Sequence, residues 1–150
     1  MTRGALVLSI LLVTGCGSAM WASVPVGGSD ASVQSLAGSW EGTFDGATGS
    51  KGVIKFELAR GSRYADGKVI FNASDPAKAT TVPIRKVDAG DAGRVVGQIG
   101  PYQEPVRQVQ VYTQFVGTLR GNTIAGVFVT RAVDSSNNEQ SGRWQMSKKL

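Results

Sequence analysis

Apolar residues recur at every second position in short runs along most of this chain, beginning near Gly38. One run places Trp40 and Phe44 among polar residues, and another covers Ile54–Leu58. Residues two apart on a strand share one face of a sheet, whereas a helix repeats every ~3.6 residues. Clusters of Gly, Asp, Asn and Ser separate the runs. The pattern predicts an all-β domain whose strands have one apolar face and one polar, solvent-exposed face.

These runs predict a single antiparallel up-and-down β-barrel of about eight strands over residues 37–150. The first and last runs carry Trp40 and Trp144, and we expect the barrel to close by pairing these runs, with both indoles in one core layer. Pro83 interrupts the fourth run, which predicts a bulge, a strand end or an edge there. The expected inward side chains are Trp40, Phe44, Ile54, Phe56, Leu58, Val69, Phe71, Val82, Ile84, Val95, Ile99, Val109, Val111, Phe115, Leu119, Ile124, Phe128, Trp144 and Met146.

The dipeptide Gly121-Asn122 predicts a two-residue hairpin turn, because both residues tolerate positive φ. Such a turn sets the register of the flanking strands, since a slip of one residue would exchange the two faces. The pairs expected on the inner face are Leu119 with Ile124, Gly117 with Gly126, Phe115 with Phe128, Thr113 with Thr130, and Val111 with Ala132.

Glycine is abundant, at 20 of the 150 residues. Glycines 42, 97, 117 and 126 fall on the predicted inner face. They can relieve crowding where strands bend, or they can leave a cavity. An eight-stranded barrel is correspondingly either filled by its own side chains or hollow enough for one small ligand.

The glycines and tryptophans also form local motifs: Gly-x-Trp-x-Gly near the first strand, Gly-x-Leu-x-Gly-Asn-x-Ile-x-Gly-x-Phe later, and Ser-Gly-x-Trp at the end. Together they resemble the small lipocalin-like barrels of secreted bacterial proteins. The resemblance implies a fold much more than an activity. The residues that carry it are Gly38, Trp40, Gly42, Gly117, Leu119, Gly121, Asn122, Ile124, Gly126, Phe128, Ser141, Gly142 and Trp144.

Composition excludes several kinds of chemistry. The chain has no histidine and a single cysteine, Cys16, which excludes a Ser-His-Asp triad, Cys-His catalysis, histidine-ligated zinc and an internal disulfide. Glu41, Glu57 and Glu104 stand apart among wet-face or turn residues, so we expect no enzyme, cofactor or metal. The formal net charge is +5 with the basic residues dispersed, which argues against nucleic-acid binding.

The N-terminal segment has the order of a secretory signal: Arg3, an apolar run too short to span a bilayer, then small residues. Val13-Thr14-Gly15-Cys16 resembles the lipobox of bacterial lipoproteins. The resemblance implies a signal peptide over residues 1–15 and a diacylglyceryl, N-acylated Cys16 anchored in a membrane. Gly17 in place of Asp implies the outer membrane, facing the periplasm. The alternative is a soluble secretory protein cleaved after Ala19.

Residues 16–36 have the Gly, Ser and Pro content of a flexible linker. Fully extended, about twenty residues would reach about 65 Å. We therefore expect a lipidated tether followed by one folded domain.

Two functions fit such a protein, and both are non-catalytic. The barrel can hold a small apolar or amphipathic ligand, with Trp40, Phe115, Phe128 and Trp144 lining the site unless they are simply core. A ligand carrier of this kind needs a continuous internal cavity of roughly 300 Å³ or more.

The other function is that of an accessory or inhibitor-type module that binds an envelope protein through its outer face. Tyr112 opposite Arg131 is the candidate contact patch, unless this is only a solvated strand face. Tyr102, between Pro101 and Pro105, is expected to be displayed on a loop that gates a ligand, meets a partner or merely connects two strands.

Overall fold

The structure is a computed structural model that describes residues 23–134 and 139–150. Neither helix in these ranges has the length and apolar character needed to cross a bilayer. The elements are β1 (Val24–Gly28), α1 (Asp30–Ser35), β2 (Gly38–Gly46), β3 (Lys51–Leu58), β4 (Tyr64–Phe71), β5 (Thr80–Ala89), the 3₁₀ turn η1 (Asp91–Gly93), β6 (Arg94–Gln103), β7 (Gln110–Arg120), β8 (Thr123–Ala132) and β9 (Gln140–Lys148).

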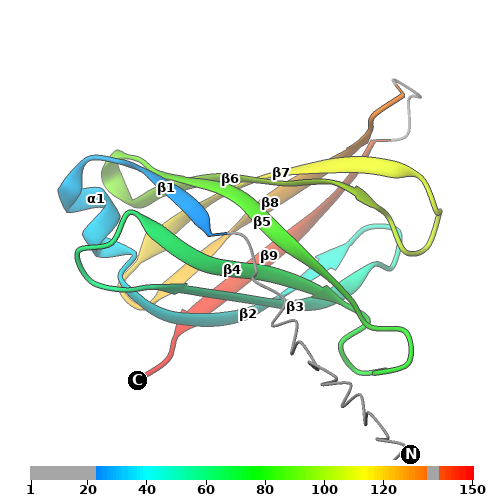
Figure 1. The fold of residues 1–150 in the computed structure, drawn as a ribbon, viewed down its shortest axis with the longest axis horizontal. Helices are drawn as coiled ribbons and strands as arrows, with labels where there is room; N and C mark the ends of the chain where they lie inside the picture. The colour runs from blue at the N-terminus through cyan, green and yellow to red at the C-terminus, as the bar shows by residue number, and fades with distance from the viewer. Residues whose placement is uncertain (1–22, 135–138) are drawn as a thin grey trace, which may run out of the picture.

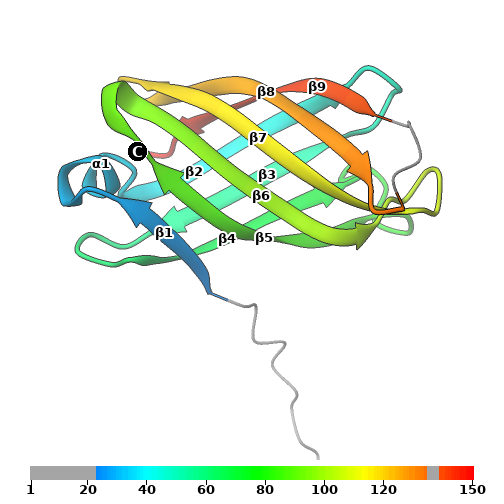
Figure 2. The same cartoon turned by 90° about the horizontal axis from the view of Figure 1, so that it is seen from above.

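The strands form one closed β-barrel, as the alternating pattern predicts (Figures 1 and 2). Strands β2 to β9 pair antiparallel in chain order, and β9 returns to pair with β2. The predicted closure of the first long strand onto the last is therefore confirmed. All five hairpin pairs around Gly121-Asn122 have the predicted register.

A ninth strand departs from the predicted architecture. β1 inserts between β4 and β5, antiparallel to β4 and parallel to β5, so a purely antiparallel up-and-down barrel is wrong in this place. β5 can accept β1 because its pairing with β4 ends at Pro83. A register shift follows between Ile84 and Lys86, which confirms the irregularity expected around this proline.

Residues 24–36, expected to be flexible linker, are instead part of the fold. Val24 and Val26 of β1 are buried, and so are Val33 and Leu36 in and after α1. Ser29 caps α1 by accepting a hydrogen bond from the Ser32 amide at 3.2 Å. The linker prediction is wrong here because these few apolar side chains are buried against the barrel and hold a short strand and a helix in place.

The barrel has two different ends (Figure 1). At the helix end, α1 packs beside the turns that join β3 to β4 and β5 to β6. Gln34 accepts a hydrogen bond from the Gly61 amide at 3.0 Å, and Arg63 pairs with Asp30. At the opposite loop end lie the connections β2–β3, β4–β5 and β6–β7. The chain thus covers one end with a helix and the other with loops.

The core is the barrel interior, and its side chains are those that the alternation predicts. Of the expected inward residues, Phe115 and Leu119 are partly buried against the core and Val109 is 37% exposed. Val109 lies outside the barrel wall because it precedes β7. The two tryptophans do not share a layer: Trp144 pairs with Phe44, whereas Trp40 pairs with Lys148 nearer the helix end.

Aromatic rings of the interior lie directly opposite glycines of neighbouring strands. The pairs are Phe44 with Gly52, Phe56 with Gly67, Phe115 with Gly97, Phe128 with Gly142, and Trp144 with Gly126. A Cβ added at Gly97 would stand 2.1 Å from the Phe115 ring. The inward glycines therefore make room for large rings, which is the first of the two roles that the sequence left open.

Candidate functional site

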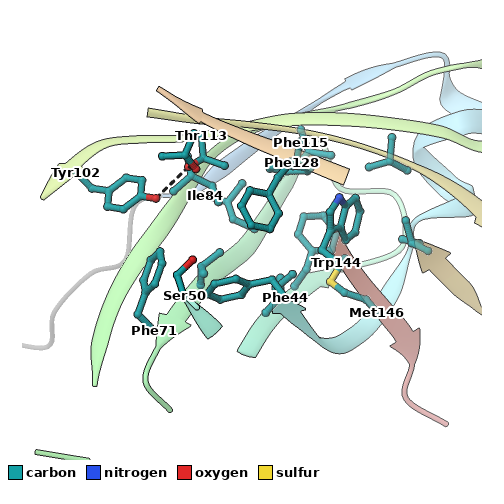
Figure 3. A pocket seen from close by; sticks show the side chains of 18 of the residues that line it. Phe44, Ser50, Phe71, Ile84, Tyr102, Thr113, Phe115, Phe128, Trp144 and Met146 are labelled. Atoms are coloured by element: carbon teal, nitrogen blue, oxygen red, sulfur yellow. Dashed lines mark hydrogen bonds between the residues drawn. The ribbon is translucent and has the colours of Figure 1, made fainter. Parts of the chain in front are cut away.

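The barrel interior contains a narrow cavity (Figure 3). Its lining residues extend from Leu36, after α1, to Glu104 at the loop end. Its volume is about 60 Å³. Pockets for drug-sized ligands have volumes of ~300–1,000 Å³, so most of this interior is filled by its own side chains. The lining residues are Leu36, Phe44, Ser50, Ile54, Phe56, Val69, Phe71, Ile84, Val87, Val95, Ile99, Tyr102, Glu104, Thr113, Phe115, Ile124, Phe128, Thr130, Gln140, Trp144 and Met146.

Three of the four predicted ligand-site residues line this cavity. Phe115 and Trp144 meet edge to face with ring centroids 5.4 Å apart, and Phe128 meets Phe44 in the same way at 6.0 Å. The indole Nε1 of Trp144 donates to the backbone carbonyls of Val116 and Val127 at 3.3 and 3.2 Å. The hydrogen bonds fix the indole against β7 and β8, where a Cβ added at Gly117 would stand 2.5 Å from its ring.

Trp40 lies outside the cavity lining. Its side chain is 1% exposed, and its Nε1 donates to the Leu36 carbonyl at 2.8 Å. Lys148 Nζ stands 5.5 Å from the centre of the indole ring. Trp40 therefore belongs to the packing that holds α1 on the helix end, the core role that the sequence left open for it.

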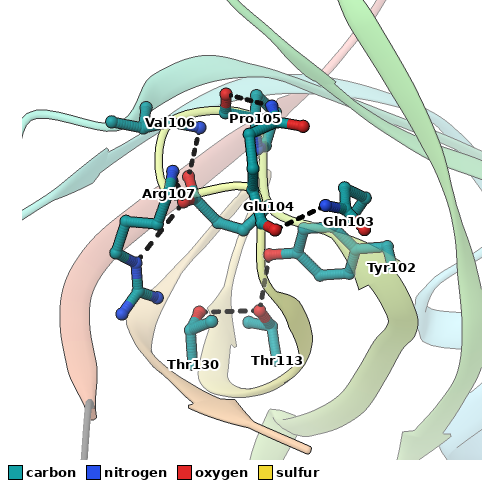
Figure 4. A network of polar contacts seen from close by, with 9 residues as sticks. Tyr102, Gln103, Glu104, Pro105, Val106, Arg107, Thr113 and Thr130 are labelled. Atoms are coloured by element: carbon teal, nitrogen blue, oxygen red, sulfur yellow. Dashed lines mark hydrogen bonds and ion pairs between the residues drawn. The ribbon is translucent and has the colours of Figure 1, made fainter.

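At the loop end, three hydroxyl groups form a chain inside the barrel (Figure 4). Tyr102 Oη lies 3.0 Å from Thr113 Oγ1, which lies 2.7 Å from Thr130 Oγ1. All three residues are buried. We call Tyr102, Thr113 and Thr130 the hydroxyl cluster. The hairpin register predicts the inward pairing of its two threonines, which the structure confirms.

The position predicted for Tyr102 is wrong. Its side chain is 9% exposed and points into the barrel rather than outward from a loop. The cause is a register shift in β6: Ile99 pairs with Thr113, but Tyr102 pairs with Val111. Because the shift moves the strand by one residue, Tyr102 and Glu104 fall on the inner side.

Glu104, expected to be solvated, is 3% exposed and lines the cavity. Its carboxylate accepts hydrogen bonds from the backbone amides of Val106 and Arg107, at 3.2 and 2.7 Å, and from Arg107 Nε at 3.4 Å. Three N–H donors thus replace water around this buried charge. Among described residues, Arg107 Nη2 is the one buried side-chain polar atom without a hydrogen-bond partner.

Both charges lie near the hydroxyl cluster and act on it. Burial raises the pKa of the Tyr102 phenol above its usual value, and the hydrogen bond with Thr113 opposes that rise. The Glu104 carboxylate raises this pKa further, whereas the Arg107 guanidinium lowers it. Tyr102 is therefore a neutral hydrogen-bonding group near neutral pH.

The outer face of β7 and β8 carries the other predicted residues. Tyr112 pairs with Arg131 as predicted. The Arg131 guanidinium, however, is bonded to Glu139 at 2.9 Å and to Gln114 at 3.4 Å. Beside them, the cross-strand pair Val116 and Val127 is 36% and 49% exposed. This face is a polar sheet surface with a small apolar centre.

Two cavity features could not be recognised from the sequence as parts of a site. Tyr102 and Glu104 require the register shift in β6, which no periodic pattern shows. Phe44 and Phe71, whose ring centroids lie 5.1 Å apart, are predicted to point inward. Nothing in the sequence, however, distinguishes a side chain that lines a cavity from one that is packed in the core. Within the described ranges, no three metal-ligating side chains gather in one place.

Comparisons with protein-family models, with curated proteins and with solved structures found no match for this chain. The fold and the interior therefore define what can be stated: this is a small closed β-barrel with a narrow, largely apolar cavity and a polar cluster at one end. Cys16 lies outside the described residues.

Proposed function

We propose that this protein is a non-catalytic binding barrel that holds one slender amphipathic molecule. The observation that supports it best is the uneven distribution of polar groups along the cavity. The six polar lining residues all lie toward the loop end, whereas the lining toward the helix end is apolar. These residues are Ser50, Tyr102, Glu104, Thr113, Thr130 and Gln140.

The cavity dimensions restrict the ligand. A volume of about 60 Å³ along the length of the barrel is too narrow for a sterol, a tetrapyrrole or a folded cofactor. It is below the roughly 300 Å³ that a carrier of a small ligand was expected to need, so a ligand can enter only if interior side chains move. A single extended acyl chain is a narrow apolar ligand, and we propose it as the ligand class that best fits so narrow a cavity.

We also propose that the barrel is held at a bacterial outer membrane through an acylated Cys16. Because β1 begins at Val24, eight residues after Cys16, the connection can reach at most about 26 Å. This is well short of the ~65 Å expected for a linker of twenty residues. The barrel would then stay close to the lipid surface, where single-chain amphiphiles are abundant. Cys16→Ser should abolish acyl labelling and release the protein from membranes; equal labelling would contradict the anchor.

Binding is tested by blocking the cavity. Val95 lines it, so Val95→Phe should fill the remaining space and abolish binding of dodecanoic acid measured by calorimetry. Thr118 has the shape of valine but is exposed on the outer side of β7, so Thr118→Phe is the matched control and should bind normally. Equal binding by both variants would place the ligand outside the barrel. Circular dichroism verifies that each variant is folded.

A second function is favoured by the exposed pair Val116 and Val127 beside Tyr112 and Arg131. This surface suits an accessory or inhibitor-type module that binds another envelope protein. Replacing Tyr112 and Arg131 by Ala and Gln should then abolish co-purification of that protein without altering the melting temperature. Unchanged co-purification would reject this patch.

A further inference from the structure

Basic side chains gather at the helix end of the barrel. The connections at this end, with the strand residues that adjoin them, carry six basic and two acidic side chains. At the loop end, the described residues of the corresponding segments carry three basic and four acidic side chains. We call the basic residues of the helix end the basic rim: Arg60, Arg63, Arg94, Arg120, Lys148 and Lys149.

Three arginines of the basic rim are exposed and unpaired. Arg60 lies in the β3–β4 turn, Arg94 begins β6 and Arg120 ends β7. None of the three forms an ion pair or a side-chain hydrogen bond with another described residue. By contrast, Arg63 and Lys149 each pair with a nearby carboxylate. Three guanidinium groups are therefore available to an anion outside the molecule.

The unpaired arginines are spread around the end of the barrel. They belong to three different connections, β3–β4, β5–β6 and β7–β8, which lie at the same end of the molecule (Figures 1 and 2). Around the closed wall, β2, β9 and β8 separate β3 from β7. Charges arranged around one end can all contact a broad anionic surface, whereas a single small anion would reach only one of them. The arrangement favours a surface as the partner.

Two further features of this end suit a lipid surface. Tyr64, the first residue of β4, is 64% exposed, and tyrosine is enriched where proteins meet lipid headgroups. Val24, the first residue of β1, pairs with Ala65 immediately beside Tyr64. A membrane-anchored Cys16, eight residues before Val24, would therefore be attached close to the helix end.

We infer that the helix end of the barrel docks on an anionic lipid surface through the basic rim. Each Lys or Arg near such a surface strengthens binding about fivefold. The inference rests on the proposed location at a membrane and adds an orientation, with the helix end toward the lipid and the loop end away from it. Acyl labelling of Cys16 is a separate measurement, so the anchor and the docking surface can fail independently.

The test measures how fast phenylglyoxal modifies each arginine of the full chain, read by mass spectrometry. The protein is mixed with vesicles of phosphatidylcholine alone, or of equal parts phosphatidylcholine and phosphatidylglycerol. On the anionic vesicles, Arg60, Arg94 and Arg120 should react several-fold more slowly than on the neutral ones. Arg85 and Arg143, exposed on the outer wall, should react equally on both. Concentrated salt should remove the protection. Equal protection of all five arginines, or of none, would overturn the inference.

Substitutions provide the residue-level test. Arg94→Gln combined with Arg120→Gln should weaken docking about 25-fold, at about fivefold for each residue, and Arg60 should then react on anionic vesicles as it does on neutral ones. The matched control, Arg85→Gln with Arg143→Gln, removes the same charge from the outer wall and should leave Arg60 protected. Equal loss of protection in both double variants would show that only net charge matters, and would overturn the role of the basic rim.

The same labelling distinguishes lipid from other polyanions. Protection of Arg60 by a DNA duplex or by polyglutamate, without protection by the anionic vesicles, would overturn the lipid partner. Should Arg94→Gln with Arg120→Gln not fold, the comparison of the two kinds of vesicle on the unmodified chain still decides the inference.

Discussion

The two ends of the barrel bury different kinds of side chain. The helix end is closed by apolar packing, where α1, Leu36 and Trp40 fit together. Among the residues that the structure describes, no charged side chain is fully buried there. The loop end buries three hydroxyls and a carboxylate. Burying polar groups contributes less to stability than burying hydrocarbon of the same size, even when they are paired. The difference indicates that the helix end maintains the fold, and under the proposed function the loop end would hold the polar part of the ligand.

The largest effect on stability is expected at the helix end. Trp40→Ala removes a fully buried indole and its hydrogen bond to Leu36, which seats α1. It should lower the free energy of unfolding by about 3–5 kcal/mol, measured by urea denaturation. Tyr112→Ala on the outer face is the control, with a change below about 1 kcal/mol. A small effect of Trp40→Ala would show that this end does not maintain the fold.

A somewhat smaller loss of stability is expected from substitutions in the middle of the barrel, where aromatic rings pack against glycines. A Cβ at Gly97 would approach the Phe115 ring to 2.1 Å and the Lys86 carbonyl to 2.7 Å. Gly97→Ala should therefore cost about 1–3 kcal/mol. At Gly67 the nearest atom is a Phe56 ring carbon at 3.1 Å, so Gly67→Ala should cost less. Equal costs in thermal unfolding would contradict this explanation of the glycines.

At the loop end, stability should depend on whether hydroxyls are left unpaired. Thr113→Val removes the partner that Tyr102 and Thr130 share, and should cost about 1–3 kcal/mol. Adding Tyr102→Phe should recover part of this loss, because one buried hydroxyl then no longer lacks a partner. A double-mutant cycle measures the recovery. Strictly additive losses would mean that the hydroxyls do not interact.

The smallest expected effect is on how the stability of the protein changes with pH. Since the pKa of Tyr102 is raised in the folded state, the folded protein retains this proton more firmly than the unfolded chain. The resulting stability is complete below the unfolded pKa of about 10 and is lost as the pH rises through the folded pKa. The melting temperature of the unmodified protein should therefore fall more steeply above pH ~10 than that of Tyr102→Phe. Parallel curves would contradict the burial of this phenol.

The period-two pattern was sufficient to predict the barrel wall, because alternation and turn chemistry are local properties. The Gly121-Asn122 turn alone specifies the register of ten cross-strand pairs, and the outward-facing Pro83 lies where β5 changes its pairing partner from β4 to β1. The pattern failed where structure depends on distant segments. β1 is only five residues of Val, Pro and Gly, and its place is decided by the gap between β4 and β5.

The candidate site was predictable in part for the same reason. Phe115, Phe128 and the two threonines follow from the hairpin register. Tyr102 and Glu104 do not, because one added residue in β6 reverses the faces after Ile99. The width of the cavity could not be predicted either. The positions of glycines do not show whether aromatic rings from neighbouring strands fill the space beside them. The burial of Arg107 Nη2 without a hydrogen-bond partner among the described residues is likewise visible only in three dimensions.

The most direct test of a polarised binding barrel is the orientation of a bound chain. Nuclear Overhauser contacts between dodecanoic acid and the methyl-labelled protein would reveal it. The chain terminus should contact Ile124 and Met146, and the methylene beside the carboxyl group should contact Thr113 and Thr130. Contacts in the reverse order, or contacts confined to Val116 and Val127 on the outer wall, would contradict the account.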